Sequence, residues 1–301
     1  MTMTADDATD AFESSRHDLL RLAYRMTGGR AEAEDIVQDA WLRWHRSDRA
    51  AVRNPRAWLS RIVANLCIDH LRKVQTRRET YIGPWLPEPI VTDPPSADDP
   101  GHAVELAQDV SYALMTLLET LKPEERAAFL LREAFDMPYG QLAQVLGKTQ
   151  DACRQMVARA RGRVRAGGAR FAATDAEHEA LLTAFAAAAQ AGDAAALTQL
   201  LAPDALFTSD GGGKASAALR TIRGATDIAK LVIHTAGQAR APRGTVRRVR
   251  LNGRPGLVIA DAGKVEVSTS IDVEAGRIAA LYIMRNPDKL QRLIGPPLGS
   301  A

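Results

Sequence analysis

Apolar side chains recur at helical spacing through the first 78 residues of the chain. The pattern predicts three amphipathic helices, over residues 11–28, 31–45 and 54–78. Gly28 and Gly29 end the first helix, and Asn54 followed by Pro55 is typical of an N-cap and a first helical position. We therefore expect a compact all-helical domain over residues 11–78.

A second helical region covers residues 108–170. Its pattern predicts four helices, over residues 108–121, 123–135 and 139–146 and from Thr149 onward. Gly147 follows the third of these, and Thr149 is a plausible N-cap for the fourth. Two helices joined by so short a turn indicate a helix–turn–helix.

The predicted secondary structure changes near residue 175. Helices are predicted first and strands afterwards, with helices over 176–190, 193–201 and 225–237 and strands over 204–209, 245–251, 256–260, 264–273 and 277–284. Three dipeptides typical of hairpin turns separate the last strands: Asn252-Gly253, Ala262-Gly263 and Ala275-Gly276. This order predicts an α+β domain with a curved antiparallel sheet over residues 175–301.

Residues 79–107 differ from both helical regions. Six of the chain's 15 prolines lie here, together with several acidic residues. Such a composition is typical of an extended segment with polyproline II character. We expect a mobile linker between the two helical domains.

Composition agrees with a multidomain globular protein. The chain has 301 residues, of which 25% are charged and 46% hydrophobic, and its net charge is only +3. That small value is a cancellation: residues 79–121 contain eight acidic residues and no Lys or Arg, whereas residues 147–170 contain seven basic residues and one acidic residue. The overall balance excludes a histone-like protein and a disordered acidic chain.

The sequence indicates a cytosolic protein without structural metal. It contains no run of 18 apolar residues, and residues 1–10 lack the basic and apolar regions of a signal peptide. The two cysteines, Cys67 and Cys153, are far apart and belong to no CxxC motif, which argues against disulfides and zinc. We expect no metal and no cofactor.

The helix that starts at Thr149 has one apolar and one polar face. Cys153, Met156, Val157, Ala160 and Val164 form the apolar stripe. Arg and Gln side chains on the other face suit guanine and adenine edges in the major groove, and nearby cations suit phosphates. The candidate DNA-binding residues are Lys148, Thr149, Gln150, Asp151, Arg154, Gln155, Arg159 and Arg161. The alternative is an ordinary solvated helix end, where the macrodipole also favours Arg.

Three blocks of the sequence resemble extracytoplasmic-function (ECF) sigma factors, the promoter-recognition subunits of bacterial RNA polymerase. Residues 34–42 resemble conserved region 2.2, residues 54–59 and 65–72 resemble regions 2.3 and 2.4, and residues 139–155 resemble region 4.2. The resemblance implies two DNA-reading domains, one for the −10 element and one for the −35 element, and it implies core RNA polymerase and promoter DNA as partners. No membrane partner is implied.

The resemblance assigns the helix over 31–45 to polymerase binding. Asp35, Gln38, Asp39 and Leu42 lie at i, i+3, i+4 and i+7 and so share one helix face. A carboxylate-rich stripe with an apolar end suits a basic coiled-coil partner. The alternative is a solvated acidic helix start.

For the −10 element, bases must be captured outside the stack by polar and aromatic groups. The polar loop before Asn54 and the basic end of the following helix are the candidate site. The residues are Arg46, Arg49, Arg53, Asn54, Trp58, Arg72 and Lys73. Trp41, Trp44 and Trp58 could equally be core side chains, because Trp at helical spacing is often buried.

Three short motifs resemble the signature of the sigma factor subgroup fused to a SnoaL-like domain, the sigma J type. They are Trp85-Leu86-Pro87-Glu88-Pro89, Asp210-Gly211-Gly212-Gly213-Lys214 and Asn286-Pro287-Asp288-Lys289-Leu290. The resemblance implies regulation in cis by the third domain, in place of a separate anti-sigma factor. From the residues alone, a polyproline linker, a flexible turn and a Pro-initiated helical turn remain the alternatives.

A second class of function is open for the third domain. Cone-shaped folds of the SnoaL type can enclose a pocket with an acidic or tyrosine side chain. The candidates here are Asp204, Asp261, His234 and Tyr282, but their spacing singles out no acid–base pair. We expect no enzymatic activity. A small bound ligand and an ordinary operator-binding regulator stay open as alternatives.

Overall fold

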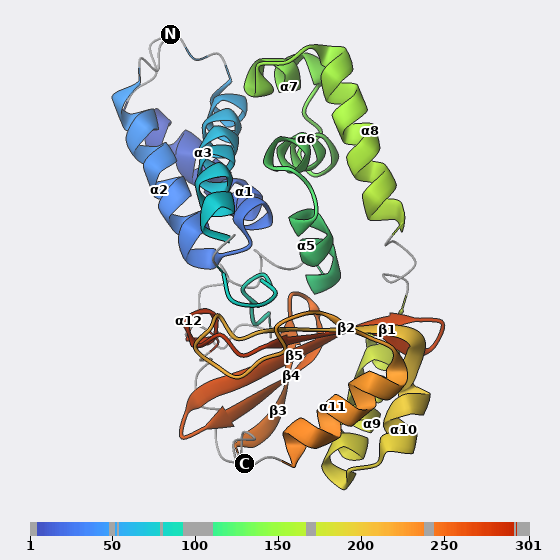
Figure 1. Ribbon diagram of the computed structural model, residues 1–301. Coiled ribbons are helices and arrows are strands. Elements are labelled where there is room, and N and C mark those ends of the chain that lie inside the picture. The colour runs from blue at the N-terminus through green and yellow to red at the C-terminus, as the bar shows by residue number, and fades with distance from the viewer. Residues whose placement is uncertain are drawn as a thin grey trace. The chain divides into compact units, whose positions relative to one another are not determined.

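The computed structural model (Figure 1) describes residues 5–47, 52, 54–78, 81–92, 111–166, 173–237, 244–291 and 293, with the side chains of residues 5–8, 75–78 and 166 outside that description. The chain forms two compact units. The first comprises Met1–Glu79 and Leu114–Ala166, and the second comprises Thr80–Ala113 and Gly167–Ala301.

The first unit is entirely helical in its described part. Its helices are α1 (Ala5–Thr27), α2 (Arg30–Arg46), α3 (Pro55–Arg78), α5 (Tyr112–Glu119), α6 (Pro123–Glu133), α7 (Tyr139–Leu146) and α8 (Gln150–Ala166). The first two residues of α5, Tyr112 and Ala113, belong to the second unit. Gly28 takes a positive φ of 74° at the end of α1, and the Ala57 amide donates to Asn54 Oδ1 at 3.0 Å. These contacts confirm the predicted end of the first helix and the predicted N-cap of α3.

The described part of the second unit contains a six-stranded open sheet and four helices. The helices are α9 (Asp175–Ala191), α10 (Ala194–Leu200), α11 (Ala225–Ala236) and α12 (Pro287–Leu290). The strands are β1 (Leu201–Asp210), β2 (Ile222–Arg223), β3 (Thr245–Leu251), β4 (Arg254–Asp261), β5 (Lys264–Glu274) and β6 (Arg277–Met284), in the order β2-β1-β6-β5-β4-β3.

The predicted antiparallel sheet forms, with one parallel pairing that the sequence did not indicate. The three hairpins from β3 to β6 are antiparallel, and Asn252, Ala262 and Ala275 each take a positive φ before their glycines, as type I′ turns require. β1, however, pairs with β6 in parallel. Periodicity reveals a strand but not its direction, and this pairing joins segments about 70 residues apart in sequence.

Both faces of the sheet are covered. On one face, α9, α10 and α11 pack Leu182, Phe185, Leu197 and Ile228 against inward-facing strand residues (Figure 1). On the other face, the core contains Leu86 and Tyr112 together with Tyr282, Met284 and Leu290. Leu86 and Tyr112 precede the third domain in sequence, so that domain's core is completed by the segment 81–92 and by the first residue of α5.

The expectation of a mobile linker was wrong for residues 81–92. Leu86, Glu88 and Ile90 are buried, and Val91 forms a bridge with Leu251 of β3. Apolar residues scattered among prolines carry no periodic signal, which is why the sequence pattern missed their burial. Residues 79–80 and 93–107, the rest of the predicted linker, lie outside the described residues.

Candidate nucleic-acid interface and motif junction

The helix–turn–helix forms as the sequence predicts. Gly147 ends α7 with a φ of 62°, and the Ala152 amide donates to Thr149 Oγ1 at 3.2 Å at the start of α8. The apolar stripe of α8 is buried at Cys153, Met156, Val157 and Ala160 and half-buried at Val164. The opposite face exposes the following candidates, with Arg161 half-buried: Lys148, Thr149, Gln150, Asp151, Arg154, Gln155 and Arg159.

Several cations of α8 are paired with carboxylates of α6. Arg159 and Arg163 lie 3.2 and 3.0 Å from the two oxygens of Glu125, and Arg161 lies 2.7 Å from Glu133. Burial opposes ionisation of Glu125, but the hydrogen bond from Arg159 and the charge of Arg163 outweigh it and keep the pKa of Glu125 below its usual value. Counting basic residues therefore overstated the charge that α8 offers to phosphates.

Arg154 is held at the exposed start of α8. Its guanidinium lies 2.5 Å from Asp151 and 5.4 Å from the centre of the Tyr139 ring. Gln155 is exposed beside it. This is the part of a recognition helix that reaches base edges in helix–turn–helix proteins.

The candidate polymerase face of α2 is exposed. Asp35, Gln38 and Asp39 are exposed, and Leu42 keeps 43% of its surface open although it is a large apolar residue. The opposite side of the same helix buries Ile36, Val37, Ala40 and Trp44. The candidate residues of α2 therefore share the exposed side of the helix.

The candidate −10 residues differ in their exposure and in their partners. Arg46, Asn54 and Lys73 are exposed, whereas Arg72, also exposed, pairs with Glu124 of α6 at 2.5 Å. Trp58 is half-buried and packs on the fully buried Trp44, with ring centres 5.2 Å apart. Trp44 is thus a core side chain, as the alternative reading held. Arg49 and Arg53 lie outside the described residues.

The three short motifs meet at one place, which we call the motif junction: Tyr81, Trp85, Leu86, Asp210, Gly212, Asn286 and Lys289. Asp210, at the end of β1, is fully buried. Its Oδ1 accepts from the Tyr81 hydroxyl at 2.6 Å and its Oδ2 from the Leu86 amide at 2.9 Å. Burial, with the hydrogen bond to Asp210, raises the pKa of Tyr81, so that the hydroxyl stays protonated and donates.

Lys289 completes the motif junction from α12. Its Nζ lies 2.7 Å from Asp210 Oδ2, donates to the Leu86 carbonyl at 2.6 Å, and stands 4.0 Å from the centre of the Trp85 ring. A buried carboxylate is thereby matched by one ammonium group and satisfied by several donors, which is the condition for burying a charge at acceptable cost.

The glycines of the second motif permit close approach. Gly212 takes a φ of 60°, and a Cβ there would stand 2.3 Å from the Asn286 side chain. A Cβ on Gly213, whose φ is 72°, would stand 2.9 Å from Ile82. Asn286 in turn donates to the Tyr81 hydroxyl at 3.0 Å. Neighbouring side chains leave no room for a Cβ at these two positions, so only glycine fits there. The glycines do not form a phosphate-binding loop or a free turn.

Sequence reasoning missed several residues that hold the segment 81–92. Asn252 accepts from the Ile90 amide at 3.0 Å, and Thr92 both donates to the Arg250 carbonyl and accepts from the Gly253 amide. Tyr112 donates to the Pro87 carbonyl at 2.6 Å. Tyr81 stands just before the first motif and Tyr112 lies within the predicted helix 108–121, and no local pattern distinguishes either from other tyrosines.

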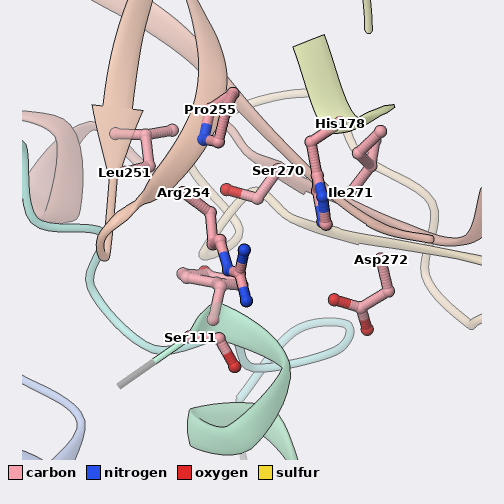
Figure 2. Close-up of a pocket in the computed structure, with 9 residues that line it drawn as sticks. Ser111, His178, Leu251, Arg254, Pro255, Ser270, Ile271 and Asp272 are labelled. Carbon is pink, nitrogen blue, oxygen red and sulfur yellow. The ribbon is translucent and has the colours of Figure 1, made fainter. Parts of the chain in front are cut away.

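A small pocket of the third domain lies against β4 and β5 and is lined by Ser111, Tyr112, His178, Leu251, Arg254, Pro255, Ser270, Ile271 and Asp272 (Figure 2). Its free volume is about 10 Å³, which is at the limit for a single water molecule. Tyr112 packs on Tyr282 there, with ring centres 5.4 Å apart, and Tyr282 donates to the buried Asp272.

Of the four catalytic candidates, only Tyr282 is inside the domain. Asp204, Asp261 and His234 are exposed. The partner of Tyr282, Asp272, was missed because it lies among apolar residues of β5. Burial lowers the pKa of His178, whose Nδ1 lies 3.0 Å from the Thr174 carbonyl.

Within the described ranges, no three His, Cys, Asp or Glu side chains gather as metal ligands would. A helix long and apolar enough to cross a bilayer is likewise not found in that part of the chain.

Comparison with known proteins defines the class. Sigma-70 region 2 matches residues 11–78, and sigma-70 region 4 matches residues 111–164. Two sigma regions in this order define a promoter-recognising sigma factor. The chain belongs to the ECF RNA polymerase sigma factors, because it is 40% identical over 297 residues to the ECF RNA polymerase sigma factor SigJ of Mycobacterium tuberculosis, covering 95% of this chain and 93% of that protein.

Two further likenesses extend over all three domains. The probable ECF RNA polymerase sigma factor SigI of M. tuberculosis is 28% identical over 290 residues, and the match covers 96% of this chain and 96% of that protein. The crystal structure of M. tuberculosis SigJ superposes with a TM-score of 0.75 at 37% identity, covering 97% of this chain and 100% of that one. The helix-and-sheet third domain is therefore part of the shared architecture.

Proposed function

We propose that this sigma factor is regulated in cis by its third domain, acting through the motif junction. The observation that carries the proposal is the buried pair Asp210–Lys289, which closes around the backbone of Leu86. Residues 81–92, which connect α3 to α5 in sequence, are thereby bound to the third domain.

This attachment restrains part of the chain that connects the two sigma regions. A free chain of residues 79–110 could span a wide range of distances, whereas a chain fixed over 81–92 spans far fewer. Promoter recognition requires a fixed separation of the −10 and −35 elements. We therefore propose that the motif junction sets the spacer length that the protein accepts, and that no separate anti-sigma factor is needed.

We assign the recognition roles as follows. Arg154 and Gln155 at the start of α8 read the −35 element, and Lys148 with the neighbouring polar residues contacts phosphates. Arg46, Asn54, Trp58, Arg72 and Lys73 serve the −10 element. Asp35, Gln38, Asp39 and Leu42 dock on core RNA polymerase, and work with polymerase and promoter places the protein in the cytoplasm.

The third domain, on this proposal, is a clamp without catalytic activity. The pocket beside Tyr112 and Asp272 has room for about one water.

Run-off transcription with purified core polymerase tests the proposal. The full chain should direct transcripts from a promoter selected in a genome-wide library, and a Lys289→Met variant should lose spacer discrimination. Equal spacer dependence of the two proteins would overturn regulation through the motif junction.

A further inference from the structure

A single carboxylate in the first unit links the two DNA-reading regions. Glu124 stands in the first turn of α6, and its two oxygens take one cation each. Arg72 Nη2 of α3 lies 2.5 Å from Oε1, and Lys148 Nζ, in the turn before α8, lies 2.9 Å from Oε2. Arg72 belongs to the part of the chain matched by sigma region 2, and Lys148 to the part matched by region 4.

A second contact, made by Arg126, also joins the two regions close to Glu124. Arg126, two residues further along α6, is 2% exposed; its Nη1 donates to the Met26 carbonyl at the end of α1 at 2.6 Å, and its Nη2 pairs with Glu119. Arg126 Nε has no hydrogen-bond partner among the described residues. Arg126 thus joins α6 to the end of α1 close to Glu124.

The ionisation of Glu124 agrees with this arrangement. The hydrogen bond from Lys148 is the main influence that lowers the pKa of Glu124; burial acts in the opposite direction, and Arg72 lowers it further. The carboxylate is therefore charged at neutral pH and presents two anionic oxygens, as a DNA phosphate does.

We propose that Glu124 is an internal competitor for promoter phosphate, which latches sigma regions 2 and 4 together when DNA is absent. The inference rests on the proposed assignment of Arg72 and Lys148 to promoter contacts. Promoter DNA and Glu124 then compete for the same two cations, and DNA binding releases both at once. Because the latch joins two regions, its loss favours the open, DNA-binding arrangement.

The test compares Glu124→Gln with Glu133→Gln in the full-length chain. Glu133 lies on the same helix with nearly the same side-chain exposure. It pairs with Arg161 of α8, itself a candidate DNA contact, so its substitution makes the same charge change and frees a cation of region 4, but it breaks no link between the two regions. Affinity for duplex promoter DNA is measured by fluorescence anisotropy at fixed salt. Glu124→Gln should bind at least about fivefold tighter than wild type, and Glu133→Gln should stay within about twofold.

A distance measurement gives a second readout. Dyes on Arg43→Cys and Gln144→Cys, both exposed sites, report the separation of α2 and α7, while the native Cys67 and Cys153 are buried. Energy transfer should fall when DNA is added to wild type and should already be lower in Glu124→Gln without DNA. Glu124→Asp, which keeps the charge on a shorter stem, should lie between the two.

The outcomes separate the latch from the proposed function. If wild type directs promoter-specific transcription but Glu124→Gln and Glu124→Asp match it in affinity and energy transfer, the latch is overturned and the promoter assignments stand. If wild type neither binds the promoter duplex nor directs transcription with core polymerase, the assignments of Arg72 and Lys148 fail and the latch fails with them.

Discussion

Lys289 Nζ lies 2.7 Å from the fully buried carboxylate of Asp210, although 79 residues separate the two in sequence. The pair is enclosed by the Trp85 ring and by the backbone of Leu86. One ion pair thus joins all three motifs that resemble the signature of the sigma J type. Breaking it should release the segment 81–92 while leaving the sheet intact.

Lys289→Met should destabilise the second unit by about 3 kcal/mol, because it leaves the Asp210 carboxylate buried without its cation. Thermal unfolding gives the loss, and limited proteolysis should show new cleavage within residues 81–92. Lys214→Met is the matched control: its pair with Asp288 is exposed on both sides and should contribute less than about 1 kcal/mol. Equal losses in both variants would contradict a special role for the motif junction.

Gly212→Ala should disrupt the motif junction for steric reasons. Any L side chain at a φ of 60° is strained by about 1 kcal/mol, and this Cβ would also collide with Asn286. Gly276→Ala supplies the control, since Gly276 has a φ of 72° with nothing near its Cβ position. Denaturant unfolding should show a loss for Gly212→Ala that is larger by at least about 1 kcal/mol. Identical losses would mean that Asn286 can move away freely.

Arg154→Ala should weaken −35 recognition by about 1–3 kcal/mol at one base pair, if the guanidinium binds a guanine edge in two places. Band shifts on a panel of single-base promoter variants measure this directly. Arg165→Ala, at the exposed end of α8, is expected to weaken all sequences alike. A uniform loss in Arg154→Ala would reassign Arg154 to a phosphate contact.

The second unit should lose stability in mildly acidic solution because of His178. Burial lowers the pKa of this imidazole in the folded protein, so the unfolded chain, with a pKa of about 6.5, binds the proton more readily. Stability is therefore complete above about pH 7 and declines as the pH falls through 6.5. His178→Gln should flatten the dependence of the melting temperature between about pH 8 and 5.5, whereas exchange of the exposed His234 should leave it in place.

Local chemistry made much of this fold predictable. Asn54 before Pro55, Gly147 between two short helices, and the three hairpin dipeptides each determine backbone geometry within a few residues, and each prediction is confirmed. The apolar stripe of α8 followed from helical periodicity alone.

The missed features depend on contacts between distant segments. Nothing around Tyr81 or Tyr112 indicates that they enter the third domain's core and junction, and no periodicity reveals that β1 runs parallel to β6. Likewise, the basic residues of α8 were counted as free charges, yet Glu125 and Glu133 on a different helix neutralise part of them. The motifs marked the junction's residues, but their partners came only from the three-dimensional structure.

Spacer-dependent transcription tests the central claim most directly. Core polymerase with the wild-type chain is assayed on promoters whose −10 and −35 elements are separated by the native spacer or by spacers two base pairs shorter or longer. The account predicts strong preference of wild type for one spacer, and a loss of that preference in Lys289→Met with Lys214→Met behaving as wild type. Unchanged spacer preference in Lys289→Met would contradict control of promoter recognition by the motif junction.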